Sequence, residues 1–403
     1  MTARLLTNIG RLWTGTEILG NAAIVTSDDR IAWVGPASEL PRRVPGVIDD
    51  IVDVDLVENL GGGLVTPGLI DAHTRPVYAG NRYAELAMRS SGLTDAEITA
   101  AGGGINATLT VTRGTDPWTL CNHVRERLAA WLRSGTTTIE AKTGYHLTRD
   151  GELAAIRTLR SLEAEPGMPR VHATFMAAHV VPPEFFGRRS DYVEAVASWC
   201  PDAAAIGADG IDVDCGDGRF TEDEARWILG AGRRSGLLTR VHAGESNPGK
   251  AVGVAADVGC ASVDLLNVAT DDDVTMLSRA GVCAVVCPAT AMRLQARPPV
   301  RAILNAGASV ALGSGHTPGA VGITSMPLVI SLAIGYLGMS VTEALRAVTV
   351  GAAHALRAPD RGAMARGRLA DIVLWEADHE GAFAWDYGLR PRRVWHGGEP
   401  VTA

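Results

Sequence analysis

The sequence predicts an α/β protein: a (β/α)8 TIM-like barrel with a small β-sandwich domain built from both termini. Three observations support this fold class. Apolar runs of strand length alternate with amphipathic segments through the middle of the 403-residue chain. Short strand-like segments occupy both ends of the chain. Polar residues close most of the central runs, as expected where barrel strands deliver side chains to a catalytic face.

The small domain is predicted from the two ends of the chain. Residues 23–36 contain two strands around an Asp28-Asp29 turn, and residues 51–57 add a third strand. Residues 371–375 and 391–401 have the same character. We therefore predict a sandwich domain from residues 1–66 plus 366–403, with a barrel domain from residues 67–365 inserted between them.

The barrel is predicted from eight strand-like runs in the order in which they occur: 64–73, Thr137–Ala141, Val171–Ala177, Gly210–Asp214, Leu238–His242, Ser262–Leu266, Val282–Cys287 and Ala308–Leu312. Helical patterns fill most intervals: Asp116–Arg133, Gly151–Ala164, Arg189–Ala197, Glu222–Ser235 and Asp271–Ala280. Eight such units over about 250 residues favour a barrel over a doubly wound sheet. The irregular stretch from Arg75 to Asn106 is predicted to be a loop over the barrel mouth.

Composition excludes several classes of function. The formal net charge is −8, and no cluster of Lys and Arg interleaved with aromatic residues stands out, which disfavours nucleic-acid binding. The longest apolar stretches are too short to span a membrane, and the N-terminus lacks a signal sequence. Six scattered cysteines without a CxxC pair indicate buried structural thiols. We expect a cytoplasmic protein with neither nucleic-acid nor membrane partners.

The candidate site begins where the first central run ends, in Asp71-Ala-His73-Thr-Arg75. Side chains two apart on a strand point to the same side, so His73 and Arg75 should project together. Two histidines at this spacing would form half of a metal site, but the second position here is arginine. Other polar residues close later runs: Glu140, Lys142, His179, Asp214, His242, Glu245, Asn267 and Ser314 to His316.

Several motifs carry a resemblance to a known family. Pro67-Gly-Leu-Ile-Asp-Ala-His73 resembles the opening signature of the amidohydrolase superfamily. More specific segments resemble imidazolonepropionase: Ala79-Gly-Asn-Arg82, Gly102-Gly-Gly-Ile105, Lys142-Thr-Gly-Tyr145, Ala177-Ala-His179, His242-Ala-Gly-Glu245, Ser325-Met-Pro-Leu328 and Gly367–Trp375. The resemblance covers nearly the whole chain. It implies a metal-dependent barrel, usually homodimeric, that hydrolyses the C–N bond of an imidazolone ring bearing a propionate.

The sequence differs from that family at positions that bind metal or take part in catalysis. The family's first metal pair is His-x-His, whereas this chain has His73-Thr-Arg75. The last-strand aspartate, which in the family ligates metal and takes a proton from water, is replaced by Gly315. Leu265 stands where the family's strand-six histidine polarises the substrate.

These changes disfavour an ordinary metal site. A catalytic metal needs about three protein ligands, and only His73 and His242 remain from the family's set. A fixed cation about 4 Å from a divalent ion costs roughly 8 kcal/mol at an effective dielectric of 20. We therefore expect no metal and no other cofactor, with Arg75 in place of the cation. Zinc or iron is expected only if His316 rebuilds the site.

Site residues follow from these arguments and from the resemblance. Arg75, His242, Glu245 and His73 are the predicted catalytic residues, with His242 and Glu245 as an acid/base pair. Arg82, Tyr145, His179 and His316 are the predicted substrate-binding residues. Arg75 has two interpretations: an ion pair with Glu245 or Asp71, or a bidentate site for a carboxylate or oxyanion. Lys142 could also be a Schiff-base lysine, but no other feature of the sequence supports that role.

Three functions remain open. The first is an imidazolonepropionase-like enzyme that acts without metal on a small carboxylate-bearing nitrogen heterocycle or amide, at a C–N bond or in a related acid/base step. The second is a metal-dependent hydrolase with rebuilt ligands. The third is a catalytically silent relative that binds a ligand. For the enzyme we expect a small anionic nitrogen-containing substrate and a homodimer.

Overall fold

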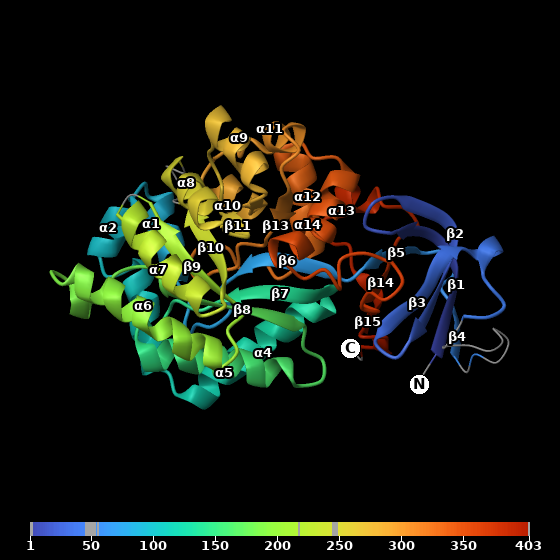
Figure 1. Ribbon diagram of the computed structural model, residues 1–403, viewed down its shortest axis with the longest axis horizontal. Helices are drawn as coiled ribbons and strands as arrows, with labels where there is room; N and C mark the ends of the chain where they lie inside the picture. Colours follow the sequence, from blue (N-terminus) through green and yellow to red (C-terminus); the bar gives the residue numbers. More distant parts are fainter. Residues whose placement is uncertain (1–2, 45–53, 55, 217, 244–248, 402–403) are drawn as a thin grey trace.

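The computed structural model describes residues 3–44, 54, 56–216, 218–243 and 249–401. Two sheets organise them (Figure 1). The barrel sheet contains eight parallel strands in sequence order: β6 (Leu69–Thr74), β7 (Thr136–Lys142), β8 (Arg170–Ala178), β9 (Gly210–Cys215), β10 (Leu238–Ala243), β11 (Ser262–Asp264), β12 (Cys283–Val286) and β13 (Val310–Leu312). The predicted barrel is confirmed.

The barrel closes between its last and first strands. A parallel bridge joins Thr74 to His316 just beyond β13. The backbone N–H of Arg75 donates to the carbonyl of His316 at 2.9 Å, and that of Gly315 donates to the carbonyl of His73 at 3.1 Å. The first and last strands therefore deliver their C-terminal residues to the same end of the barrel.

The second sheet is built from both ends of the chain, as predicted. Its eight strands are β1 (Ala3–Trp13), β2 (Ile18–Ser27), β3 (Arg30–Pro36), β4 (Leu56–Asn59), β5 (Leu64–Pro67), β14 (Ile372–Trp375), β15 (Pro391–His396) and β16 (Glu399–Pro400). Figure 1 shows the blue N-terminal strands and the red β14 and β15 to one side of the barrel. Most of the predicted strand at 51–57 lies outside the described residues.

The predicted strand 64–73 is in fact two strands in different sheets. Gly68 separates β5 from β6, and its N–H donates to the carbonyl of Asp371 at 2.8 Å. A Cβ at Gly68 would lie 2.1 Å from the Thr137 hydroxyl oxygen, so only glycine fits this crossing between the sheets. The single apolar run therefore passes from the small domain into the barrel.

The barrel strands are covered by helices: α4 (Pro117–Arg133), α5 (Arg149–Glu163), α6 (Arg189–Ala205), α7 (Glu222–Arg234), α8 (Gly249–Val258), α9 (Asp271–Ala280), α10 (Pro288–Arg293), α11 (Val300–Asn305), α12 (Met326–Leu337), α13 (Val341–Ala347) and α14 (Val350–Ala355). A short α15 (Ala382–Trp385) follows β14. The buried side chains of α7 (Ala225, Ile228, Leu229 and Ala231) follow the helical repeat that predicted this element. No helix of the described chain is long and apolar enough to cross a membrane.

The prediction of a loop between Arg75 and Asn106 is wrong. This stretch contains α1 (Tyr83–Ser90) and α2 (Asp95–Ala100), and α3 (Gly104–Gly114) begins within it. A capping box starts α2, because the Thr94 hydroxyl accepts from the Glu97 N–H while the Glu97 carboxylate accepts from the Thr94 N–H. Glycines at 102–104 separate short helices here instead of forming one flexible loop.

Candidate active site

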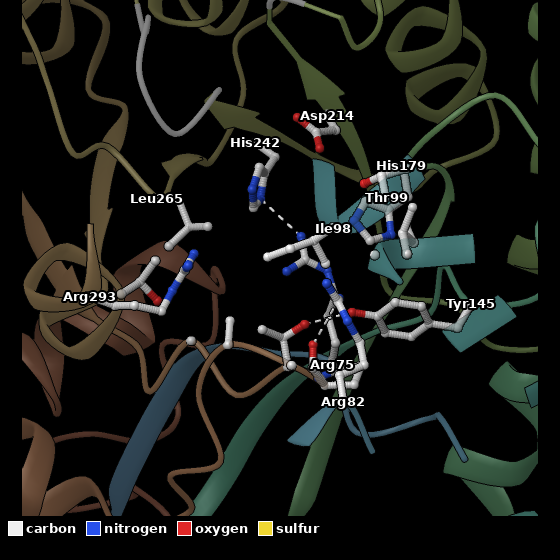
Figure 2. A pocket seen from close by; sticks show the side chains of 18 of the residues that line it. Arg75, Arg82, Ile98, Thr99, Tyr145, His179, Asp214, His242, Leu265 and Arg293 are labelled. Atoms are coloured by element: carbon white, nitrogen blue, oxygen red, sulfur yellow. Dashed lines mark hydrogen bonds between the residues drawn. The ribbon is translucent and has the colours of Figure 1, made fainter. Parts of the chain in front are cut away.

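A cavity of about 410 Å³ lies at the C-terminal ends of the barrel strands (Figure 2). This volume suits a small molecule. Within the described chain, the lining includes one carboxylate, Asp214, and five guanidinium groups: Arg75, Arg82, Arg89, Arg219 and Arg293. The cavity wall is therefore rich in fixed positive charge.

Arg75 lies at the centre of the site, directly after β6. It is 4% exposed, and its Nη2 lies 3.2 Å from Nδ1 of His242 and 3.6 Å from the sulfur of Met176. Its buried Nε has no hydrogen-bond partner. Among the described residues, no carboxylate forms an ion pair with this guanidinium. The cation is thus held by an imidazole and a thioether.

One proposed ion-pair partner of Arg75 is excluded. The carboxylate of Asp71 accepts from the Trp131 indole at 2.9 Å and from the backbone N–H groups of Ser314 and His73 at 2.9 and 3.2 Å. Burial raises the pKa of Asp71 to about 6, with these hydrogen bonds opposing the shift. The hydrogen bonds of Asp71 therefore connect β6 to α4 and to the segment that follows β13. The other proposed partner, Glu245, lies outside the described residues.

Arg75 fixes the hydrogen-bonding state of His242. A guanidinium has donors and no acceptor, so Nδ1 of His242 must accept and its proton must reside on Nε2. Burial, followed by the charge of Arg75, holds the pKa of His242 well below its usual value. His242 lines the cavity, so it offers a neutral N–H donor there.

His73 has the opposite arrangement. Its Nδ1 lies 2.8 Å from Oδ2 of Asp264, while its Nε2 is buried without a partner. Burial and then Lys142 lower the pKa of His73 to about 3. The ring centroids of His73 and His242 are 5.3 Å apart. His73 is fully buried and is not among the residues lining the cavity, so it lies behind the cavity wall.

Lys142 lies at the centre of a buried charge cluster beneath the site. Its ammonium is 2.8 Å from both Glu140 and Asp212, and 2.9 Å from Asp264. Arg240 adds a second cation 3.0 Å from Asp264. Burial alone would raise the pKa of Asp264, but Arg240 and Lys142 hold it well below its usual value. With its ammonium enclosed by three carboxylates, Lys142 is not placed as a Schiff-base lysine.

The residues do not fit a divalent metal at the position that the family resemblance implies. The guanidinium of Arg75 lies 3.2 Å from Nδ1 of His242, and Gly315 supplies no ligand. A second group, His73, Glu140 and Asp264, brings ligand atoms within 4.8 Å of one another. There the Lys142 ammonium already contacts both carboxylates. Both candidate positions contain a protein cation, and the absence of a metal stays a prediction.

Three predicted substrate-binding residues line the cavity. Arg82 donates through Nε and Nη2 to the two oxygens of Glu85, at 2.6 and 2.7 Å. The Tyr145 hydroxyl lies 2.6 Å from the Thr317 hydroxyl, and His179 Nδ1 lies 3.0 Å from the Gly144 carbonyl. The structure brings these side chains together around Arg75 (Figure 2). Their roles with substrate stay predictions.

The fourth, His316, is not among the residues that line the cavity. Its Nε2 lies 3.2 Å from the Tyr78 hydroxyl and its Nδ1 lies 3.2 Å from the Ile323 carbonyl. Its ring packs edge-on to Trp131 at 4.9 Å. Both ring nitrogens have partners, the Tyr78 hydroxyl and the Ile323 carbonyl, so His316 is not placed to replace a lost metal ligand.

Sequence reasoning gave no role to four charged residues of the cavity, one of which is Arg89 in the last turn of α1. Asp214 is the last residue but one of β9 and was visible as a polar residue at the end of its apolar run, but nothing in the sequence gave it a role. Arg219 follows in the β9–α7 connection, and Arg293 is the last residue of α10. No motif marks either arginine, because their position at the cavity depends on how these segments fold.

Comparisons with known proteins identify the family of this chain. A model of the amidohydrolase family matches residues 64–401. The imidazolonepropionase of Geobacillus sp. (strain WCH70) is 38% identical over 377 residues, covering 93% of this chain and 88% of the relative. The imidazolonepropionase of Salinispora arenicola is 37% identical over 411 residues, covering 99% of both chains.

Solved structures support the fold alone. A mutant of the Arthrobacter aurescens atrazine chlorohydrolase, complexed with zinc and atraton, has a TM-score of 0.75 at 18% identity, over 99% of this chain and 95% of that one. The ochratoxinase of A. niger has a TM-score of 0.71 at 20% identity, over 100% and 96%. With its barrel, its cavity and these relatives, the chain belongs to the amidohydrolase family of hydrolytic enzymes.

Proposed function

We propose that this protein is an imidazolonepropionase-like enzyme that works without the family's usual metal. Its substrate would be a small carboxylate-bearing nitrogen heterocycle or amide, cleaved at a C–N bond or changed in a related acid/base step. Arg75 would supply the positive charge at the reaction centre. The observation that carries this proposal is the buried Arg75 guanidinium, 3.2 Å from His242 where a metal would otherwise be shared.

Two N–H donors support electrostatic catalysis at this point. Arg75 has donors beyond the one that faces His242, and His242, which lines the cavity, carries its proton on Nε2. When water attacks a carbonyl or amidine carbon, negative charge develops on the attached heteroatom. Fixed donors aimed at such an atom each contribute about 10²–10³ in rate in other acyl-transfer enzymes. A buried guanidinium with no carboxylate partner among the described residues is suited to this role.

The charge of the cavity supports an anionic substrate. Arg82 and Arg89 converge on Glu85, with Nη2 of Arg89 at 2.9 Å from its carboxylate. These arginines surround a cavity in which Asp214 is the one carboxylate of the described lining. Guanidinium groups attract carboxylates, and a substrate carboxylate that shares these groups with Glu85 would orient the ring. Glu245, the predicted acid/base partner of His242, stays a prediction from the sequence.

The proposal is tested by turnover on a panel of five-membered nitrogen rings. We expect wild-type protein to consume a ring bearing a propionate, such as 4-imidazolone-5-propionate or hydantoin-5-propionate. Mass spectrometry would measure the loss of substrate and the appearance of product. The methyl ester of the same compound should react at least tenfold more slowly, because it lacks the charge that the arginines bind. Binding of the acid without any product from the whole panel would contradict the proposal and favour the catalytically silent alternative.

A further inference from the structure

Thr290 has a side-chain hydroxyl without a hydrogen-bond partner within the described chain. The residue lies in α10, is 4% exposed and lines the cavity. Because α10 directly follows β12, Thr290 lies at the end of the barrel where the strands deliver their polar residues. A nearly buried polar group that lacks a partner in the protein costs free energy unless solvent or a ligand supplies the hydrogen bond. Its position at the cavity indicates a ligand.

The Thr290 hydroxyl lies against the backbone of Gly315, just beyond the last barrel strand. Gly315 also lines the cavity, and its φ of 69° is in the left-handed region. A Cβ atom at position 315 would lie 2.6 Å from Oγ1 of Thr290, which is closer than the two atoms can approach. The hydroxyl therefore occupies the space that a side chain at this position would enter.

The cavity offers many more donors than acceptors. Each of the five guanidinium groups in its described lining can only donate. His242 adds a further donor, because its Nδ1 accepts from Arg75 and its proton is on Nε2. A heterocycle bound here therefore finds partners readily for its carbonyl oxygens, whereas a ring N–H group needs one of the few acceptors.

Most acceptors of the described lining already have a donor or a cation beside them. The carbonyls of Pro318 and Gly319 each accept from an arginine at 3.3 Å. The hydroxyls of Thr317 and Tyr145 lie 2.6 Å apart and bond to each other. The Asp214 carboxylate forms an ion pair with an arginine at 3.3 Å. These groups are therefore engaged before a ligand binds.

Two side chains of the described lining keep an open acceptor. His179 donates through Nδ1 to the Gly144 carbonyl at 3.0 Å. Burial, followed by the charge of Arg75, holds the pKa of His179 well below its usual value, so its Nε2 has a lone pair and no proton. Oγ1 of Thr290 is the other acceptor. The family resemblance pointed to His179, whereas no local signal marks Thr290.

The inference rests on the proposed function, in which a small nitrogen ring with a carboxylate binds in this cavity. We propose that Thr290 is a specificity-determining residue, which accepts a hydrogen bond from a ring N–H of the substrate. The arginines bind the carboxylate and the ring carbonyl. Thr290 distinguishes a ring with a free N–H, such as an imidazolone or a hydantoin, from one whose nitrogen is alkylated.

Substitution at position 290 tests this contact. Thr290→Val removes the hydroxyl and keeps the branched shape, so KM for the ring substrate should rise about tenfold while kcat changes less than threefold. Thr290→Ser keeps the hydroxyl and should stay within threefold of wild type in both constants. Thr275→Val, at an exposed threonine of α9, is the matched control and should keep the wild-type KM.

Methylated rings test the N–H itself. Hydantoin-5-propionate is compared with its N1-methyl and N3-methyl derivatives. Wild-type protein should prefer the unmethylated ring at least tenfold in kcat/KM over one of the two derivatives, and Thr290→Val should reduce that preference at least fivefold. The methyl group meets a side chain of similar size in both proteins, so the lost hydrogen bond accounts for the change.

Two results would overturn the inference. One is a Thr290→Val variant with the wild-type KM, and the other is an unchanged preference for the unmethylated ring. If wild-type protein turns over nothing, the proposed function fails separately, and isothermal titration calorimetry makes the same comparisons on binding. Equal affinities of wild type and Thr290→Val for hydantoin-5-propionate would then contradict the contact, and so would a wild-type protein that does not bind the ring.

Discussion

Replacing Arg75 by methionine is expected to lower kcat at least a thousandfold while leaving the protein as stable as wild type or more so. The loss of activity has two physical sources. The guanidinium no longer donates to the developing oxyanion, and His242 is no longer held as an Nε2–H donor. Stability should not fall, because Arg75 is a buried cation that has no carboxylate partner among the described residues, and such a cation is costly to desolvate.

The measurement pairs turnover with thermal unfolding of the same preparations. Arg75→Lys is the matched control, because it keeps the positive charge but loses the paired N–H donors of the planar guanidinium. We expect its activity to lie between those of wild type and Arg75→Met. A clear fall in the unfolding temperature of Arg75→Met would contradict the account. That result would favour the alternative in which Arg75 is a structural ion-pair partner, with Glu245 as the remaining candidate.

Replacing Lys142 by methionine is expected to cost the largest amount of stability of any single change in the described site. Glu140, Asp212 and Asp264 would lose the ammonium that lies 2.8–2.9 Å from each of them. Removing one partner from a buried ion network costs about 3–5 kcal/mol, because the remaining charges stay buried. Urea denaturation should therefore show a lower midpoint, or the variant should fail to fold.

A second variant keeps this prediction testable. Lys142→Met combined with Asp212→Asn removes one charge of each sign and should recover part of the lost stability. Lys250→Met, at an exposed lysine, should stay within about 0.5 kcal/mol of wild type. If Lys142→Met unfolds at the wild-type midpoint, the cluster is not an ion network on which the barrel depends.

Much of the barrel could be predicted because its strands are short apolar runs closed by polar residues. The transition at Gly68 could not, because the clash that requires glycine there comes from Thr137, on another strand. The helices α1 and α2 were missed because they are short and lie between glycines. One local signal was present, since Thr94 and Glu97 have capping-box spacing.

The candidate site was predictable in part. The spacing of His73 and Arg75 predicted that the two side chains project together, and the family resemblance added Arg82, Tyr145 and His179. Three features depend on contacts between strands that no local pattern contains. These are the Arg75–His242 contact, the opposite hydrogen-bonding states of the two histidines, and the carboxylates around Lys142.

The central claim is that Arg75 replaces the metal, and it is tested most directly by measuring metal content and turnover on one preparation. Protein purified without chelator is analysed for zinc and iron, assayed on the active ring substrate, then treated with chelator and assayed again. The account predicts far less than one metal ion per chain and unchanged turnover after chelation. One metal ion per chain, with turnover lost on its removal and restored by zinc or iron, would contradict it.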